Sequence, residues 1–415
     1  MNSSTILRRV GAALSIPWQR TLYIMFFAQF ITAIGFSSIF PFLPLYVKAL
    51  GTRTGLSIEF LAGMTFSSQA LTMMVASPLW GALADRKGRK VMVERAMFGG
   101  AVILLLMAFV RSAEELVLLR AVQGLITGTV AAANALVAAV APREDTGYAM
   151  GLLQVGLGSG IALGPLIGGG IADLYGYNAA FYVTSGMLFV AGIMVWFGVQ
   201  EEFHPAIFEE KTGSSFLANW RDIFSAPGAA AAYQLRFISQ LGRMLIVPIA
   251  PLFIEMLLAG SEGVNTFTGL VVGSAAATAT LSAVYLGRLG DRIGHRKILI
   301  ASSALAALLY LPHSLVTSGW QLLLLQALVG VAMGGVVPAI SALLAKFTRA
   351  GLEGAVYGLD NSIDSGARSI APLLGSGIAL WFGLRATFTA TALLFLAAAG
   401  LAAWGLPKIR QAPGE

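Results

Sequence analysis

The chain has 415 residues, of which 57% are hydrophobic and only 11% are charged. A soluble domain carries about 25% charged residues, so a soluble fold is excluded and the apolar surface must face lipid. The absence of cysteine excludes disulfides and thiolate metal sites, and the three histidines are too far apart in the sequence to form a ligand pair. The formal net charge of +7 does not indicate nucleic-acid binding, because the basic residues lie in short segments between apolar runs.

Twelve apolar runs follow one another along the chain, and a membrane-spanning helix needs about 20 apolar residues. We therefore predict an all-α polytopic membrane protein with twelve transmembrane helices. The runs are Thr21–Val47, Glu59–Leu83, Val91–Val110, Leu116–Val140, Gly147–Leu174, Ala179–Val199, Ala229–Leu258, Phe267–Leu289, Lys297–Val316, Trp320–Leu344, Gly354–Phe382 and Arg385–Leu406.

The basic residues predict the orientation, because short cytoplasmic loops are enriched in Lys and Arg. With both termini in the cytoplasm, eighteen Lys and Arg residues fall on the cytoplasmic side. Only four fall on the outer side: Lys48, Arg53, Arg111 and Arg385. We predict a multi-pass protein of the bacterial cytoplasmic membrane, most simply a monomer, with both termini inside.

One long polar segment, Gln200–Pro227, divides the runs six and six. We predict an N-terminal six-helix bundle over residues 1–199, a cytoplasmic linker over 200–227, and a C-terminal bundle over 228–415. The halves also repeat each other at an offset of 206 residues, with one residue of slippage in places. Matching pairs are Gly81 and Gly287, Asp85 and Asp291, Arg86 and Arg292, Gly88 and Gly294, Gly124 and Gly330, and Pro165 and Pro372. A parallel duplication of this kind is one known transporter plan.

The first run is rich in phenylalanine and contains no acidic residue. Such a stripe usually packs against other helices or meets lipid. The alternative is a wall for an amphipathic substrate, with Phe36 and the polar Gln29 as the candidate contacts.

The segment Gly81–Lys90 joins the second and third runs and contains Asp85, Arg86, Gly88 and Arg89. Glycine permits a tight turn, and an aspartate at a helix end can face a neighbouring helix N-terminus, where the dipole favours an anion. We expect this segment to stabilise one conformation by contacting the second half near the start of the eleventh run. The plainer interpretation is a basic cytoplasmic turn, but the copy at Asp291 and Arg292 favours a specific role.

The fourth run contains Arg120 several residues from its start. A charged side chain inside a span is costly unless it faces water or a partner, which makes it a functional candidate. The alternative is an arginine that extends to the nearby outer surface. The counterpart in the second half is the uncharged Gln326.

The fifth run places small residues four apart at Gly156, Gly160 and Gly164, and continues through Pro165 to Gly168 and Gly169. Small residues at this spacing let two helices pack at backbone contact, and proline removes a backbone donor and bends a helix. A helix that serves only for packing would show part of this pattern. The ending Gly-Pro-x-x-Gly-Gly is rarer and suits a helix that moves.

The loop at Gly81–Lys90, its copy, Arg120 and the fifth-run glycines together resemble the twelve-span drug:proton antiporters of the major facilitator superfamily. The resemblance covers nearly the whole chain. It implies two bundles that rock about a central site, export of small amphipathic molecules, protons as the coupling ion, and no cofactor or enzymatic activity. This sequence departs from some members at the first run, where Gln29 is found and no carboxylate is available for coupling.

Charged residues inside the seventh and eleventh runs complete the candidate site. Asp360, Asp364 and Arg368 are four residues apart and share one helix face, and Arg236 and Arg243 share a face of the seventh run. Their depths match, so we expect them to pair. With Arg120, four arginines against two aspartates leave two positive charges, which favours an anionic or zwitterionic amphiphile. Asp364 and then Asp360 are the candidate proton carriers. The alternative is a purely structural clasp between the two runs.

We predict a secondary active, proton-coupled exporter of amphipathic drugs or metabolites that works by alternating access. A lipid or lysolipid flippase of the same fold, or a membrane receptor that transports nothing, are the alternatives. The sequence contains no phosphate-binding loop of the Gly-x-x-x-x-Gly-Lys-Ser/Thr type, which disfavours ATP as the energy source.

Overall fold

The computed structural model describes residues 16–142, 144–201, 228–258, 262–347 and 353–407, which contain helices and no strand. The predicted linker 200–227 lies outside the described residues except for Gln200 and Glu201. The first half forms α2 (Pro17–Ser38), α3 (Leu43–Leu50), α4 (Ile58–Lys87), α5 (Arg89–Met107), α6 (Ala113–Ile126), α7 (Thr129–Val140), α8 (Thr146–Tyr175) and α9 (Tyr177–Gly198). The second half forms α11 (Ala229–Leu245), α12 (Ala250–Leu257), α13 (Val264–Ile293), α14 (His295–His313), α15 (Gly319–Phe347), α16 (Glu353–Phe382) and α17 (Leu384–Trp404).

The twelve predicted spans are present, but three of them consist of two helices each. The first span is α2 with α3, the fourth is α6 with α7, and the seventh is α11 with α12. Proline occupies the first turn of both α3 and α12, where its missing N–H needs no partner. Between α6 and α7, Gly128 adopts a φ of +138°, which only glycine tolerates readily.

Among the described residues, seven helices are long and apolar enough to cross a membrane by length and composition alone. The helices α4, α5, α14 and α16 are not among these seven.

The sequence repeat is also a repeat of contacts. The hydroxyl of Thr72 donates to the carbonyl of Ala121 at 2.7 Å, and Thr278, 206 residues later, donates to Ala327 at 2.8 Å. Lys90 donates from the start of α5 to the carbonyl of Trp196 near the end of α9. Its counterpart Arg296 donates to the equivalent carbonyl of Ala402 at the end of α17. The chain therefore folds as two equivalent six-helix bundles.

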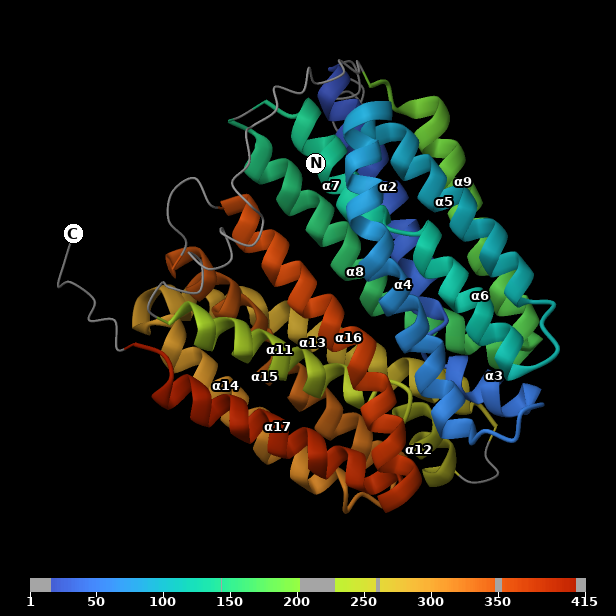
Figure 1. Ribbon diagram of the computed structural model, residues 1–415, viewed down its shortest axis with the longest axis vertical. Helices are drawn as coiled ribbons and strands as arrows, with labels where there is room; N and C mark the ends of the chain where they lie inside the picture. The colour runs from blue at the N-terminus through green and yellow to red at the C-terminus, as the bar shows by residue number, and fades with distance from the viewer. Residues whose placement is uncertain (1–15, 143, 202–227, 259–261, 348–352, 408–415) are drawn as a thin grey trace, which may run out of the picture.

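The most extensive contacts between the bundles are those of α8 with α13 and of α4 with α16, and α3 also meets α12. The bundles converge where α3 and α12 lie and diverge toward the other end of the molecule, as Figure 1 shows. We call the converging end, with Lys48 and Glu255, the far end. The end that carries the turns at Gly88 and Gly294 is called the motif end.

Candidate functional site

The charged side chains of α11 and α16 form one cluster in the second half. The guanidinium of Arg236 lies 3.1 Å from a carboxylate oxygen of Asp360 and 3.8 Å from one of Asp364. Arg368 lies 2.6 Å from the other oxygen of Asp364. Arg243 donates to the amide oxygen of Gln240, one turn earlier on its own helix. The four-residue spacing on α16 places the two aspartates on the face that meets α11.

This cluster is not fully satisfied. Asp360 and Asp364 each keep one buried carboxylate oxygen that accepts no hydrogen bond from the described residues. The Nε atoms of Arg236 and Arg243 also lack an acceptor among those residues. Buried polar atoms are rarely left unpaired. These four atoms are therefore the open hydrogen-bonding positions of the cluster among the described residues.

A mostly apolar hollow of about 380 Å³ borders the cluster, lined by Tyr233, Gln234, Phe237 and Ile238 of α11, with Ile363 of α16 among its other residues. Its lining residue Tyr233 interacts electrostatically with Asp360, which connects the hollow to the cluster. Apolar walls next to a few polar groups are typical of small-molecule sites.

Arg120 lies apart from this cluster, in the first half. It is 1% exposed. Its Nε donates to the carbonyl of Thr65 at 3.0 Å, Nη1 donates to Gln123 at 2.5 Å, and Nη2 donates to Gln69. All three acceptors are neutral, and the guanidinium also lies over the ring of Phe66, 5.7 Å from its centroid. The side chain is buried in a hydrogen-bonded site and does not extend to the surface. Sequence reasoning did not anticipate Gln69, which is its partner on α4.

The two candidates on α2 differ in their surroundings. Gln29 is 2% exposed, and its amide oxygen accepts no hydrogen bond from the described residues. Phe36 is partly buried and packs against the apolar core of the first half. The two therefore offer an unsatisfied polar group and a packing contact, respectively.

The segment Gly81–Lys90 is mostly helical. The helix α4 continues to Lys87, and Gly88, with φ +96°, is the single residue between α4 and α5. Arg86 is exposed, and a Cβ added to Gly81 would meet nothing within 4 Å. The side chain of Asp85 and those at the start of α16 lie outside the described set, so the expected contact between them remains a prediction.

The start of α5 has partners that the sequence did not reveal. The carboxylate of Glu201 accepts the backbone N–H groups of Arg89 at 2.9 Å and Lys90 at 2.8 Å. The guanidinium of Arg89 donates to the carbonyl of Ala135 at 3.1 Å. Anionic groups stabilise helix N-termini, so Glu201, at the start of the predicted linker, ties that segment to the motif end.

The second copy of the segment is built differently. Gly294, with φ +99°, separates α13 from α14. Asp291 is exposed and lies 3.1 Å from the Nε2 atom of His295, whereas Arg292 lies in the last turn of α13. The turn and the contact of the basic residue two positions after its glycine are repeated, but the second copy has His295 at the position of Arg89.

The fifth-run glycines allow two different close approaches. Cβ atoms added to Gly160, Gly164 and Gly168 would lie 2.6, 2.0 and 2.0 Å from the nearest atoms of α2. A Cβ added to Gly169 would lie 2.2 Å from the carbonyl oxygen of Asn265 on α13. Real Cβ atoms do not approach so closely, so α8 touches α2 along one face and the second bundle along another. Next to that second face, the carbonyl of Pro165 would lie 2.1 Å from a Cβ added to Gly269.

Sequence reasoning missed a second buried polar group. His313 of α14 is fully buried, with Nδ1 at 2.7 Å from the carbonyl of Leu309 and Nε2 at 3.0 Å from the amide oxygen of Gln326. Gln326 is the repeat counterpart of Arg120. Arg120 and Gln326 thus occupy equivalent positions in the two halves and both form hydrogen bonds inside their bundles. The group is a charged guanidinium in the first half and a neutral amide in the second.

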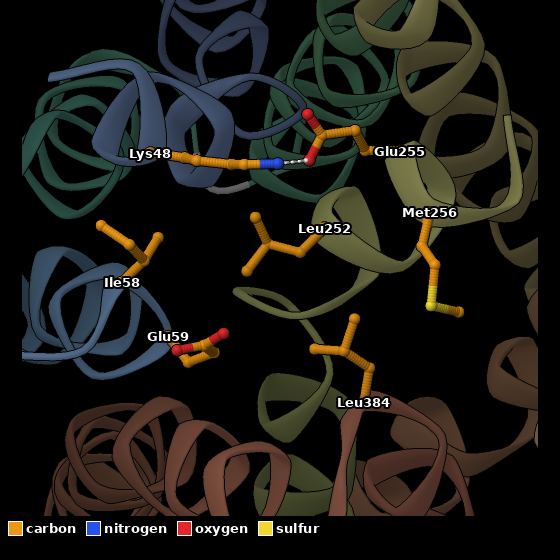
Figure 2. A pocket seen from close by; sticks show the side chains of 7 residues that line it. All are labelled: Lys48, Ile58, Glu59, Leu252, Glu255, Met256 and Leu384. Carbon is orange, nitrogen blue, oxygen red and sulfur yellow. Dashed lines mark hydrogen bonds and ion pairs between the residues drawn. The ribbon is translucent and has the colours of Figure 1, made fainter. Parts of the chain in front are cut away.

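At the far end, Lys48 of α3 and Glu255 of α12 form an ion pair of 2.7 Å between the halves, as Figure 2 shows. The pair borders a hollow of about 510 Å³, which is also lined by Ile58, Glu59, Leu252, Met256 and Leu384. Lys48 and Glu255 are 207 residues apart, which is the slipped form of the repeat offset. The offset was the signal that could have found this pair.

The comparisons with known proteins decide the family. The model of the Major Facilitator Superfamily matches residues 25–235 and 233–415. The chain belongs to this superfamily. It is 35% identical over 397 residues to the multidrug resistance protein MdtG of Rahnella sp. (strain Y9602), covering 95% of both chains. It is 34% identical over 402 residues to MdtG of Yersinia enterocolitica, covering 96% of both.

A solved structure shows the same fold at low sequence identity. It is the bacterial homologue of the human lysosomal transporter Spinster, in an inward-facing and unoccupied conformation, with a TM-score of 0.80 and 14% identity. The match covers 96% of this chain and 99% of that one. The predicted fold and family are confirmed: the chain is a multi-pass membrane transporter of the multidrug type and not an enzyme. Its bacterial relatives indicate the cytoplasmic membrane.

Proposed function

We propose that the protein is a proton-coupled exporter of amphipathic small molecules that alternates between two conformations of its bundles. The observation that carries this proposal is the partly satisfied charged cluster at Arg236, Asp360, Asp364 and Arg368, next to an apolar hollow. The name of these relatives, multidrug resistance protein, supports the substrate class. In this proposal the motif end faces the cytoplasm, and residues 1–199 and 228–415 are the two moving units, joined by 200–227.

Asp364 is the proposed proton carrier and Asp360 the second. Asp364 lies between two arginines here, 3.8 Å from Arg236 and 2.6 Å from Arg368. If a shift within the second bundle moves one guanidinium away, burial favours the protonated form of the carboxyl group. The free oxygen atoms of both aspartates offer a place for the proton. Arg120 is proposed to assist from the first half, as a buried positive charge held by neutral acceptors.

The charge balance supports an anionic or zwitterionic substrate. Three arginines of the cluster against two aspartates leave one positive charge, and Arg120 adds a second. Uncompensated buried charge is unfavourable by several kcal/mol per ion, and an anionic ligand reduces that penalty. Arg243, Arg236 and Arg368 are the proposed contacts for the anionic group, and Gln29 and Phe36 those for the remainder of the molecule.

The segment with Gly81, Asp85, Arg86, Gly88 and Arg89 is proposed to stabilise one of the two conformations from the motif end, together with Asp291 and Arg292. Glycines 160, 164, 168 and 169 and Pro165 are proposed to let α8 move against its neighbours. The Asp85→Asn variant is expected to reduce transport while folded protein remains in the membrane, and wild-type turnover would contradict that role.

Transport into proteoliposomes tests the proposal, with and without an imposed pH gradient. Asp364→Asn is expected to abolish accumulation of substrate against its gradient while ligand binding persists. Arg243→Gln is expected to weaken anionic ligands more than neutral ones. The matched control is Asn361→Gln, a polar change at an exposed position on the same helix. Accumulation by Asp364→Asn equal to wild type would refute the proton-carrier role, and wild-type behaviour of both variants would make the cluster a structural clasp.

A further inference from the structure

A carboxylate of the first half caps the N-terminus of a helix of the second half. Asp173 lies on the last turns of α8, at the far end. One of its oxygens accepts the backbone N–H of Asn265 at 3.2 Å and the side-chain amide at 2.7 Å. The other accepts the backbone N–H of Thr266 at 2.6 Å and its hydroxyl at 2.5 Å. All four hydrogen bonds cross the boundary between the bundles.

The helix that receives this carboxylate has no cap of its own. The N-cap residue of α13 is Gly263, which has no side chain and makes no capping hydrogen bond. The first N–H groups of a helix need acceptors from outside the helix, and an anion is the favoured partner. Asp173 supplies the acceptor atoms and the negative charge from the opposite bundle. Its hydrogen bonds are charge-assisted, the strong class for N–H and O–H donors.

The equivalent place in the other interface is built without such a contact. The helix α4 is the repeat counterpart of α13, and its N-cap Ser57 accepts the N–H of Phe60 from within the same helix, at 3.3 Å. The positions of α16 equivalent to Asp173 are the apolar Ala379 and Leu380. Beside the start of α4 lies the 510 Å³ hollow that contains Ile58 and Glu59. Only one of these two helix junctions is therefore tied across the bundles by a carboxylate.

We propose that Asp173 is the latch of the far end: a positioning residue that holds α8 against α13 in the conformation described here and must release α13 for the far end to open. Opening separates the two bundles at this end, so the four hydrogen bonds break together and the N-terminus of α13 loses its cap. This inference rests on the alternating access of the proposed function and adds a named residue that sets its equilibrium.

The experiment measures the conformation directly and not through transport. Arg111 and Thr317 are exposed far-end residues of the first and second halves and occupy equivalent positions 206 residues apart. Because the chain contains no cysteine, spin labels on the Arg111→Cys and Thr317→Cys pair report a single distance across the far end. In lipid nanodiscs, Asp173→Asn and Asp173→Ala are expected to shift the population at least about tenfold toward the longer distance, since a lost hydrogen bond to a charged group has an effect of that size.

The matched control is Glu114→Gln. Glu114 is also a far-end carboxylate with four acceptor contacts, from Thr52, Arg53 and Thr54, but all of them lie within the first half. Its removal is expected to leave the distance distribution unchanged. Thr266→Val, which removes one donor from α13, is expected to give a smaller shift in the same direction as Asp173→Asn.

An unchanged distance distribution in both Asp173→Asn and Thr266→Val would overturn the latch. If Asp173→Ala does not fold, the other two variants decide. The outcome is independent of proton coupling, because the distance is measured without a gradient or substrate. If Asp173→Asn shifts the distance and Asp364→Asn still couples transport to protons like wild type, the role of Asp173 as latch stands and the role of Asp364 as proton carrier is rejected.

Discussion

The interface between α8 and α13 and the interface between α4 and α16 are repeat counterparts, yet they are held by different means. In both, a proline carbonyl of one bundle meets a glycine of the other: Pro165 faces Gly269, and Pro372 faces Gly63. At the far end, however, α13 is capped in trans by Asp173, whereas α4 is capped in cis by Ser57. A duplicated fold can thus keep its helix packing and still place a specific polar contact on one side only. The following predictions test this difference.

The largest effect is expected from filling the backbone contact of the α8–α13 interface. A leucine at Gly169 would place its Cβ 2.2 Å from the carbonyl oxygen of Asn265. This oxygen belongs to the backbone, so no side-chain rotation can relieve the overlap. We expect Gly169→Leu to lower transport by at least about a hundredfold, because the helices must separate by more than the one ångström that already disturbs a functional geometry. Uptake in vesicles measures it. The control is Gly170→Leu, where an added Cβ meets nothing within 4 Å. An equal loss of transport in both variants would show that the loss does not come from the contact between Gly169 and Asn265.

Replacing one glycine by alanine in each of the two interfaces compares their contacts directly. At Gly269 the added Cβ would meet the carbonyl of Pro165 at 2.1 Å, and at Gly63 it would meet the hydroxyl of Ser376 at 2.4 Å and the carbonyl of Pro372 at 2.8 Å. A hydroxyl can rotate away, but a backbone carbonyl cannot. We expect Gly269→Ala to reduce transport about tenfold and Gly63→Ala only a few-fold, in keeping with an overpacking penalty of about 1–3 kcal/mol. Ser376→Ala is expected to restore part of the activity of Gly63→Ala, but none of that of Gly269→Ala. Rescue of both variants would be inconsistent with this difference.

A smaller effect is expected from the ion pair between α3 and α12. The side chains of Lys48 and Glu255 are 54% and 36% exposed, and exposed ion pairs contribute about 0–1 kcal/mol. We expect Lys48→Gln or Glu255→Gln to change the far-end distance populations less than about fivefold, and less still at high salt. The exchanged pair Lys48→Glu with Glu255→Lys is expected to behave like wild type. A larger effect than that of Asp173→Asn would show that the ion pair, and not Asp173, dominates closure.

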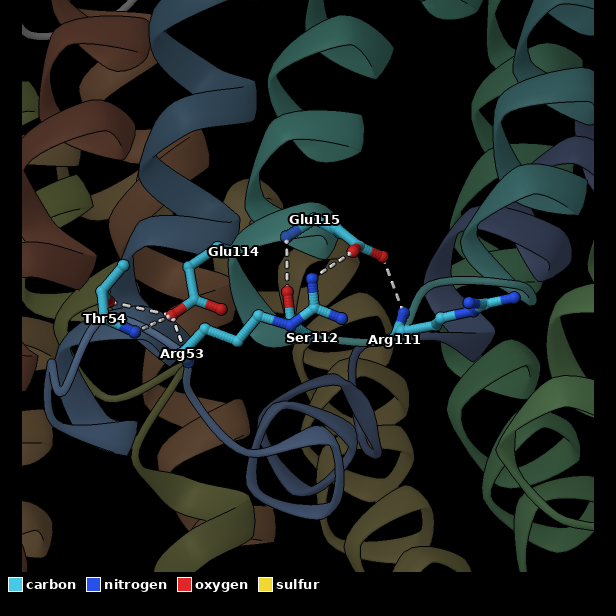
Figure 3. A network of polar contacts seen from close by, with 6 residues as sticks. All are labelled: Arg53, Thr54, Arg111, Ser112, Glu114 and Glu115. Atoms are coloured by element: carbon cyan, nitrogen blue, oxygen red, sulfur yellow. Dashed lines mark hydrogen bonds and ion pairs between the residues drawn. The ribbon is translucent and has the colours of Figure 1, made fainter.

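The smallest effect is expected at Glu114, whose contacts stay within one bundle (Figure 3). A backbone hydrogen bond at Glu114, together with donors from Thr52 and Thr54, holds the pKa of this carboxyl group well below its usual range. A lowered folded-state pKa gives stability that is present above the unfolded-state pKa and is lost as the pH falls through the folded-state value. We expect Glu114→Gln to lower the thermal midpoint slightly at neutral pH, and the gap to wild type to close under strong acid. If the difference in thermal midpoint between the two proteins widens on acidification, the predicted direction of the pH dependence is wrong.

The sequence alone predicted the spans, the repeat and the shared faces of the charged residues, because apolar runs, offsets and four-residue spacings are local patterns. The spacing of Asp360, Asp364 and Arg368 and the matched depth of Arg236 placed these groups on facing helices. It did not predict that Arg243 contacts Gln240 of its own helix, because that depends on side-chain rotamers. The breaks at Gly128 and before α12 were also missed, since the apolar character continues through them.

Asp173 and Glu201 were missed for a different reason. Each is one acidic residue near the end of an apolar run, a place where charges are common and carry little information. Their partners belong to other helices and become neighbours only after the helices assemble. For Asp173 a signal was available: Gly263, just before the eighth run, leaves a helix without a capping side chain.

The positions of Lys48 and Glu255 also have a consequence for the history of the chain. In a dimer of two identical halves, a residue on the twofold axis meets its own copy, so this position would have held two identical side chains. Two identical side chains cannot form a lysine–glutamate ion pair, so the pair of 2.7 Å has no symmetric ancestor. One of its members must have changed after the two halves became separately inherited. The asymmetry at the far end therefore belongs to the fused chain and could not have been present in a homodimeric precursor.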